Sequence, residues 1–191
     1  MIKKAIFIRH GESLANVMNI ITEDLEGYPL TERGMEQVLF SAEQLKGLKI
    51  DGIISSPILR TRQTANAIAD RLNLTVKIDT RVRESGLGQY NGYKLENVPK
   101  LSREDLGMES WFSQVNRMRS IINDYEGNYV VVSHALPIRA VVASFLDLDE
   151  RESFGIEIRP ASMSAVDIEN NKVLSIGTLL LSDRIRKVFS Q

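Results

Sequence analysis

The chain of 191 residues contains no cysteine. This absence excludes a disulfide framework, a thiolate nucleophile, thiol redox chemistry and any cysteine-ligated zinc or iron–sulfur site. An excess of either charge is also missing, because 24 Lys and Arg face 25 Asp and Glu and leave a formal charge of −1. The total charge therefore gives no reason to expect a nucleic acid or an anionic membrane as a partner, and any anion binding must be local.

Long hydrophobic runs are missing as well. The apolar stretch Ala5 to Ile8 is stopped by Arg9 and His10 and is too short for the core of a signal peptide. No run approaches the length of a membrane-spanning helix. We therefore expect a cytoplasmic protein with no membrane partner. The composition is typical of soluble globular proteins, and the length suits a single domain over residues 1–191.

The order of apolar patterns predicts the class of fold. Short β-branched or Ile-rich runs predict strands, and apolar spacings of three and four residues predict helices, the first of them capped by Thr31. The expected strands are 2–8, 51–56, 76–78 and 129–132, the expected helices are 31–48, 59–74, 109–125 and one opening at Leu136, and 163–168 with 172–179 forms a hairpin. This order predicts an α/β three-layer sandwich with a mostly parallel central sheet that is partly antiparallel near the C-terminus.

The segment Glu84 to Gly107 is the least regular part of the chain. It contains several glycines, a proline and many charges, so we interpret it as a loop or lid. We expect this segment and Asn16 to Tyr28 to form the walls of a ligand pocket. The cations of segment 84–107, Lys94, Lys100 and Arg103, either reach a second anionic group of the ligand or remain in solvent, and we favour the solvent.

The chain has only two histidines, and each directly follows an apolar strand. In open α/β sheets, ligands bind beyond the carboxyl ends of the strands. For a single histidine, an incidental polar residue is the simpler interpretation. His10 and His134 together, with Arg9 beside one of them, favour a site. A neutral imidazole is a competent nucleophile toward phosphorus, and guanidinium groups form paired hydrogen bonds with phosphate.

Two further arginines follow the strand that ends near Ser56. On a helix, Arg60 and Arg62 would point about 200 degrees apart, so at most one of them faces a pocket. We assign Arg60 to the pocket and Arg62 to the solvent.

Four motifs, in order along the chain, resemble those of the histidine phosphatase superfamily, also called the phosphoglycerate mutase-like family. Arg9-His10-Gly11-Glu12-Ser13, followed by Asn16, is similar to the Arg-His-Gly motif of that family. The stretch 30–34 resembles the start of its first helix, 55–65 its second arginine motif, and 132–135 its second histidine motif. The tripeptide alone is a weak indication, whereas the ordered set is a strong one.

Glu84 stands where phosphatases of this family have a glutamate that acts as the acid, and like that glutamate it precedes a stretch with several glycines. An alkoxide leaving group needs a proton, and the water that attacks a phosphohistidine needs a base. One carboxyl group can serve both steps in turn. The alternative is that Glu84 is a loop carboxylate paired with Arg81 or Arg83.

The resemblance implies a metal-independent phosphomonoester hydrolysis with no cofactor and a small phosphorylated metabolite as substrate. His10 would become a phosphohistidine, and Glu84 would act as general acid and base. The groups that would hold the phosphate or the substrate are Arg9, Arg60, His134, Asn16, Ser13 and the backbone amide of Ala135.

Two departures from the family pattern bear on the activity. Ala135 stands where the family usually has glycine, and a requirement for positive φ there would change the local geometry. Ser85 follows the acid in place of the arginine that is usual in mutases, and the chain is short, which favours a phosphatase. Against the assignment as a phosphatase, the dipeptide Glu12-Ser13 is often seen in mutases and bisphosphatases of the family. A cofactor-dependent phosphoglycerate mutase, which would need 2,3-bisphosphoglycerate, is therefore the alternative.

Other functions have less support. A non-catalytic phospho-ligand binding module would not need His10, Glu84 and His134 together. A serine esterase built on Ser13 would leave Arg9 and Arg60 without a role, and the closing glycine of its motif is missing. Homodimers are common among small enzymes, so a homodimer is the expected assembly, and the sequence leaves the subunit count open.

Overall fold

The computed structural model describes residues 1–190. Their six strands form one sheet in the order β3-β2-β4-β1-β5-β6. The strands are β1 (Ile2–Arg9), β2 (Gly52–Ser55), β3 (Val76–Ile78), β4 (Gly127–Ser133), β5 (Met163–Asp167) and β6 (Lys172–Thr178). The α-helices are α1 (Leu14–Val17), α2 (Glu32–Leu45), α3 (Leu59–Leu72), α4 (Trp111–Ser120), α5 (Ala135–Ser144) and α6 (Asp183–Phe189).

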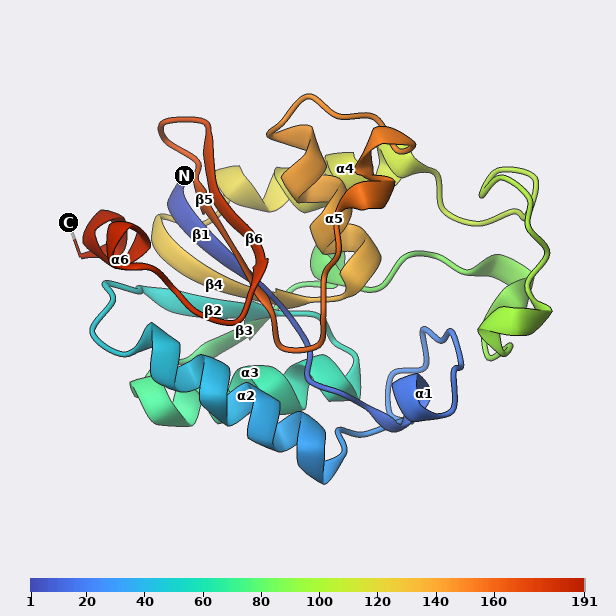
Figure 1. The fold of residues 1–191 in the computed structure, drawn as a ribbon, viewed down its shortest axis with the longest axis horizontal. Helices are drawn as coiled ribbons and strands as arrows, with labels where there is room; N and C mark the ends of the chain where they lie inside the picture. Colours follow the sequence, from blue (N-terminus) through green and yellow to red (C-terminus); the bar gives the residue numbers. More distant parts are fainter. Residues whose placement is uncertain (191) are drawn as a thin grey trace.

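The sheet is mixed in the way that the sequence predicts. Strands β1, β2, β3 and β4 run parallel, whereas β5 is antiparallel to β1 and β6 is antiparallel to β5. Helices α2 and α3 cover one face of the sheet and α4 and α5 cover the other, so the architecture is a three-layer α/β sandwich (Figure 1).

Both faces of the central strands are buried, and alternate residues point to opposite faces. Ile6 and Ile8 of β1 pack with α2, α3 and α6, whereas Ala5 and Phe7 pack with α4 and α5. Strand β4 repeats the alternation, with Val130 and Val132 on the first side and Tyr129 and Val131 on the second. This double burial explains why these strands have no polar face in the sequence.

Several predicted boundaries are corrected by the structure. Helix α2 ends at Leu45 rather than near Leu48, since Lys46 already leaves the helical conformation, and α3 ends at Leu72 because Asn73 is left-handed at φ 54°. Helix α4 begins at Trp111 and passes at Ile121 into a 3-10 turn. Among the described residues, α1 and α6 are helices that the sequence patterns did not predict.

Candidate active site

The two histidines are neighbours because of the register of β1 and β4. These strands pair in parallel with Arg9 opposite Ser133, so the residue after each strand reaches the same edge of the sheet. The ring centroids of His10 and His134 are 5.2 Å apart and meet edge to face. Both rings are buried. The site therefore lies where the carboxyl ends of β1, β2 and β4 converge.

His10 is held in a single tautomer whose outer nitrogen, Nε2, is unprotonated. The Nδ1 atom lies 2.7 Å from the carbonyl oxygen of Gly11, which can only accept, so Nδ1 carries the proton. The Nε2 atom then accepts a hydrogen bond from Nε of Arg60 at 3.1 Å. Burial, together with the positive charges of Arg60 and Arg9, holds the pKa of His10 well below its usual value. The imidazole is therefore neutral at physiological pH, as a nucleophile must be.

Two guanidinium groups bring unused donors to this position. Nη2 of Arg60 donates to the carbonyl of Thr22 at 2.9 Å, and Nη1 of Arg9 donates to that of Ile158 at 2.8 Å. In the described part of the chain, Nη1 of Arg60 and Nε of Arg9 are buried without a hydrogen-bond partner. Unsatisfied buried donors are rare and need an explanation. An anion bound beside His10 would satisfy them.

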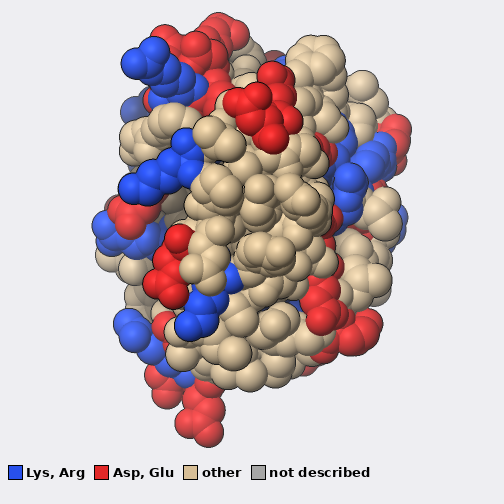
Figure 2. Space-filling model, turned by 90° about the vertical axis from the view of Figure 1, so that its right-hand side faces the viewer, with Lys and Arg blue, Asp and Glu red and all other residues tan. Residues whose placement is uncertain are grey.

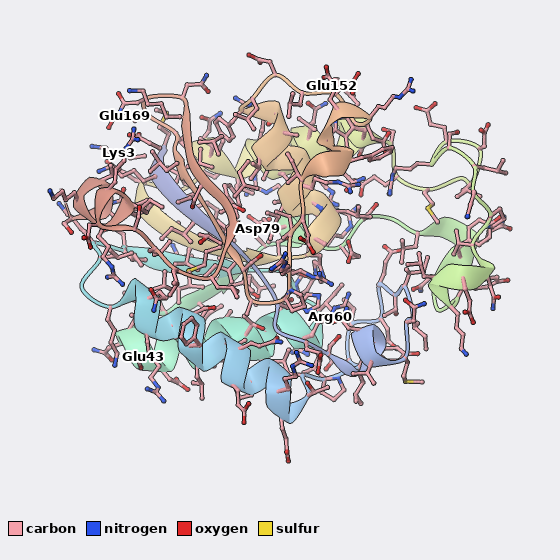
Figure 3. All side chains as sticks on the ribbon, viewed as in Figure 1. Lys3, Glu43, Arg60, Asp79, Glu152 and Glu169 are labelled. Carbon is pink, nitrogen blue, oxygen red and sulfur yellow. The ribbon has the colours of Figure 1, made fainter. Side chains whose placement is uncertain are left out.

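Arg60 comes from the first turn of α3, which faces the end of the sheet. Figure 3 shows it near the N-terminal end of that helix, on the α1 side of the molecule. Arg62 instead forms an ion pair with Glu26 at 2.6 Å on the surface. The prediction that only one of the two arginines enters the pocket is confirmed. Burial lowers the pKa of Arg60, and the nearby carboxylate of Glu84 acts in the opposite sense.

Glu84 lies between the second histidine and the arginines. Its Oε2 is 3.5 Å from Nδ1 of His134 and 3.8 Å from Nη2 of Arg60, and its Oε1 accepts the backbone N–H of Ser85 at 2.8 Å. Burial raises the pKa of Glu84, partly offset by the charges of Arg60 and Arg9. A carboxyl group with a raised pKa can supply a proton near neutral pH.

The alternative ion pair of Glu84 with Arg81 or Arg83 is not formed in the structure. Arg81 forms ion pairs with Asp79 and Asp124, both at 2.6 Å. Arg83 donates to the carbonyl of Thr80 at 3.4 Å. The carboxylate of Glu84 is thus directed into the site.

His134 completes the inner surface. Its Nε2 lies 2.9 Å from Oγ of Ser56, and its Nδ1 lies 3.3 Å from Nη2 of Arg60. Burial and the charge of Arg60 hold the pKa of His134 well below its usual value. A hydrogen bond from Arg60 requires Nδ1 to be unprotonated, whereas one to the carboxylate of Glu84 requires it to carry a proton. The proton on His134 is therefore coupled to the protonation of Glu84.

The glycines of two motifs are needed for close backbone approach. A Cβ atom at Gly11 would overlap the carbonyl of Gly34, and one at Gly34 would overlap the carbonyl of Glu12. Thr31 fixes the same contact, since its N–H donates to the carbonyl of Glu12 at 3.0 Å and its hydroxyl to the carboxylate at 2.8 Å. The start of α2 thus supports the loop that carries His10.

The three remaining predicted site residues have different positions. Asn16 and Ala135 line the cavity. Ser13 is fully buried outside the lining, where its hydroxyl and its N–H both donate to Oδ1 of Asn16 at 3.0 Å. Ser13 therefore orients Asn16. Ala135 begins α5 and is not among the residues with positive φ, so alanine fits there and its N–H belongs to the unpaired amides of a helix start.

A cavity of about 360 Å³ opens beside these groups, a size suited to a small molecule. Its lining includes residues of both segments that the sequence assigned to the walls. They are Asn16, Asn19, Ile20, Ile21, Thr22, Glu84, Leu87 and Leu95.

A sequence profile of the histidine phosphatase superfamily (branch 1) matches residues 5–176. The chain belongs to this superfamily. The 2,3-bisphosphoglycerate-dependent phosphoglycerate mutase of Thermoplasma acidophilum is 40% identical over 194 residues, with 97% of each chain covered. Phosphoserine phosphatase 1 of Hydrogenobacter thermophilus is 30% identical over 187 residues, with 88% of each chain covered.

Solved structures share the histidine phosphatase fold. A mycobacterial glucosyl-3-phosphoglycerate phosphatase in complex with VO3 is 25% identical, with a TM-score of 0.76 over 85% of this chain and 92% of that chain. The family and the fold expected from the motifs are confirmed. The individual roles of the site residues stay predictions.

One pair of site-supporting residues in this histidine phosphatase was missed from the sequence. Arg117 of α4 donates to the carbonyls of Arg81, Arg83 and Glu84 at 2.7, 2.9 and 3.2 Å. It forms a two-point ion pair with Glu109, at 2.6 and 2.8 Å, and Glu109 accepts the N–H of Gly86 at 3.0 Å. The pair fixes the backbone on both sides of Glu84.

Two further findings concern the described residues of this histidine phosphatase. Within residues 1–190, no helix has both the length and the apolar character needed to cross a membrane. No group of three or more His, Asp or Glu side chains in that range is placed to hold a metal ion.

Proposed function

We propose that this histidine phosphatase superfamily member hydrolyses phosphomonoesters through a phosphohistidine on His10. The observation that carries the proposal is the arrangement around Nε2 of His10. This nitrogen has a lone pair, belongs to a neutral ring, accepts a hydrogen bond from Arg60, and lies in a cavity lined by two guanidinium groups with unused donors. Fixed donors aimed at a reacting group stabilise charge that develops in the transition state.

In the first step, Nε2 of His10 attacks phosphorus, and the bond from phosphorus to the ester oxygen breaks. Glu84 gives its proton to that oxygen, so the leaving group departs as a neutral alcohol. Arg9, Arg60, His134 and the first amide of α5 donate to the phosphoryl oxygens. The raised pKa of Glu84 and the lowered pKa of His10 place both groups in the required state over one range of pH.

In the second step, water attacks the phosphohistidine and the P–N bond breaks. The carboxylate of Glu84 takes the proton from water and regains the state in which the cycle began. Inorganic phosphate and neutral His10 are the products of this step. The proposal assigns no step to a metal ion or a cofactor, because guanidinium and imidazole donors take the place of a cation around the phosphoryl group.

A second candidate function is phosphoglycerate mutase activity. The 40% identity to the mutase of Thermoplasma acidophilum over nearly the whole chain favours it. The same phosphohistidine would then pass its phosphoryl group to a second hydroxyl instead of to water. This candidate predicts interconversion of 2- and 3-phosphoglycerate that depends on 2,3-bisphosphoglycerate.

The proposal is tested with p-nitrophenyl phosphate in excess EDTA. We expect hydrolysis at neutral pH that persists in the chelator and is abolished in His10→Ala. No hydrolysis by the intact enzyme, or hydrolysis that His10→Ala leaves undiminished, would overturn the proposal. Loss of activity in EDTA would overturn the metal-independent part alone.

The natural substrate in this proposal is a small phosphorylated metabolite. The names of the relatives support that class, since they refer to phosphoglycerate, phosphoserine and glucosyl-3-phosphoglycerate. A cytoplasmic location and a homodimeric assembly stay predictions from the sequence.

A further inference from the structure

The cavity has two chemically different ends. At one end lie the groups that surround Nε2 of His10. The other lining residues are mostly apolar, with Asn16, Asn19 and Thr22 among them. Beside Ala135, whose N–H lies at the phosphoryl end, the hydrocarbon side chains are those of Ala15, Ile20, Ile21, Leu87, Leu95 and Leu136.

The part of the cavity away from His10 has no cation among its lining residues. Arg9 and Arg60 are the only lysine or arginine residues that line it within the described chain, and both act at the reacting phosphoryl group. Lys94, next to Leu95, has a side chain that is 58% exposed and lies 3.9 Å from the carboxylate of Glu96. A second anionic group on a substrate would find no further cationic side chain in this lining, only the neutral amide groups of Asn16 and Asn19.

Other nearby cations are engaged in the protein itself. The expectation that Arg103 remains in solvent is wrong, because its side chain is only 16% exposed and donates to the carbonyl of Glu109 at 2.9 Å and to the hydroxyl of Ser85. Arg62 is paired with Glu26. Both lie outside the cavity lining, and each already contacts other groups of the folded enzyme.

The apolar wall is fixed by backbone hydrogen bonds. The N–H of Ile21 donates to the carbonyl of Tyr93 at 2.9 Å, and the N–H of Leu95 donates to that of Asn19 at 2.9 Å. These bonds tie two segments into a short antiparallel pair at Ile20 and Lys94. The hydrocarbon surface is thus preformed, which limits the entropy lost on binding.

The molecular surface around α1 and the segment after Glu84 is also largely uncharged. Figure 2 shows the face that carries α1 and the segment after Glu84, with a broad uncharged area at its centre and charged side chains grouped at its edges. The exposed large hydrophobic residues of these two segments include Val17, Met18, Tyr93, Leu95 and Leu101.

We propose that the substrate of this site is a phosphomonoester whose leaving group is uncharged and largely apolar, such as an alkyl or aryl chain. This inference rests on the proposed phosphatase function and specifies its substrate class. A leaving group of this kind transfers apolar surface from water to the Ile20, Leu87 and Leu95 side chains. The phosphoglycerates and phosphoserine lack that surface and bring a carboxylate, for which the lining holds no further cation.

The first test compares kcat/KM for ethyl, butyl and hexyl phosphate with kcat/KM for 3-phosphoglycerate. Each methylene that becomes fully buried is expected to raise kcat/KM about fourfold, from the cost of exposing a CH₂ group to water. Hexyl phosphate should then exceed 3-phosphoglycerate. A value for 3-phosphoglycerate that equals or exceeds that for hexyl phosphate would overturn the inference.

A matched pair of leucine variants locates the effect in the cavity. Leu95 lines the cavity and is 55% exposed, whereas Leu180, between β6 and α6, lies outside the lining and is 61% exposed. Leu95→Ala should lower kcat/KM for hexyl phosphate several-fold more than that for ethyl phosphate, and Leu180→Ala should change neither. Equal effects of Leu95→Ala on both esters would contradict the assignment.

A binding experiment separates this inference from the phosphatase proposal. Calorimetric titration of His10→Ala with hexyl phosphate and with 3-phosphoglycerate needs no turnover. Tighter binding of hexyl phosphate supports the inference, and tighter binding of 3-phosphoglycerate overturns it. If the intact enzyme hydrolyses none of the esters, the phosphatase proposal fails, and the titration still decides which class of ligand the cavity prefers.

Discussion

The guanidinium of Arg60 donates its Nε–H to Nε2 of His10 across 3.1 Å. The arginine is 3% exposed, and its neighbouring Nη1 is buried without a partner. The Arg60 side chain therefore donates to the lone pair of the proposed nucleophile through Nε and also places an unpartnered donor, Nη1, beside it. When phosphorus bonds to Nε2, the same N–H groups lie next to the phosphoryl oxygens.

This relationship predicts different results for two arginines on the same helix. Arg60→Lys keeps a positive charge but loses the planar fork, so kcat/KM for p-nitrophenyl phosphate should fall by about 10² to 10³. Arg62→Lys is the matched control, because Arg62 faces Glu26 at the surface, and it should retain full activity. Equal losses in both variants would contradict the role given to Arg60. Circular dichroism of each variant would verify its fold.

Replacing the proposed acid should affect substrates according to their leaving groups. In Glu84→Gln, kcat/KM for an alkyl phosphate should fall by about 10² to 10⁴, because the alkoxide needs a proton. Nitrophenolate leaves without one, so its first release should remain fast while hydrolysis of the phosphohistidine slows. Stopped-flow measurement should therefore show a burst of nitrophenolate close to one equivalent per active site. Equal losses for both esters and no burst would exclude Glu84 as the shared acid and base.

The Arg117–Glu109 pair leads to a prediction about positioning. Arg117→Met removes three hydrogen bonds to the carbonyls around Glu84, so kcat should fall about tenfold to a hundredfold with little change in KM. Because the charge of Arg117 lowers the pKa of Glu84, its loss should raise that pKa and move the alkaline limb of the pH–rate profile upward. Arg119→Met on the same helix is the control. An unchanged alkaline limb would show that Arg117 is merely structural.

The buried histidines should make the enzyme sensitive to mild acid. The folded state holds the pKa of both His10 and His134 well below the ordinary value, so between pH 6.5 and 5 the unfolded chain binds protons that the folded chain does not. Stability then falls as pH falls, by up to about 3 kcal/mol over this range for two histidines.

Glu84 acts in the opposite sense in part of that range, because its raised pKa makes the folded state bind a proton that the unfolded chain has released. The measurement is therefore urea unfolding of Glu84→Gln at several pH values. Adding His10→Asn should roughly halve the pH dependence. A free energy of unfolding that is flat between pH 6.5 and 5 would contradict the burial of neutral imidazoles.

The parts of the fold predicted from sequence are those with strong local signals. The Ile-rich and Val-rich runs of β1 and β4 identify buried strands because both of their faces meet helices. Helix α6 was missed, although Ser182 caps it and Ile185 and Phe189 pack into the core. The apolar spacing in a helix of seven residues extends over a single repeat, which is too short a pattern to distinguish α6 from a loop.

In the candidate active site, too, the residues with a strong local sequence signal were predicted and the others were not. The histidines and Arg60 were predictable because each side chain follows the end of a strand in a recognisable motif. Arg117 acts on backbone carbonyls 33 to 36 residues away and Glu109 on the N–H of Gly86, 23 residues away, and no side-chain pattern encodes those contacts. Ser13 was assigned to the ligand, but its hydrogen bonds to Asn16 show that the same motif residue can serve the shape of the loop.

The most direct test of the account is detection of the covalent intermediate. Glu84→Gln enzyme is mixed with p-nitrophenyl phosphate and quenched in alkali after one turnover, since phosphohistidine is labile in acid, and the peptides are mapped by mass spectrometry. We expect one phosphoryl group on His10 and none in the Glu84→Gln, His10→Ala double variant. A phosphoryl group on another residue, or none on His10 despite a full burst of nitrophenolate, would contradict the mechanism.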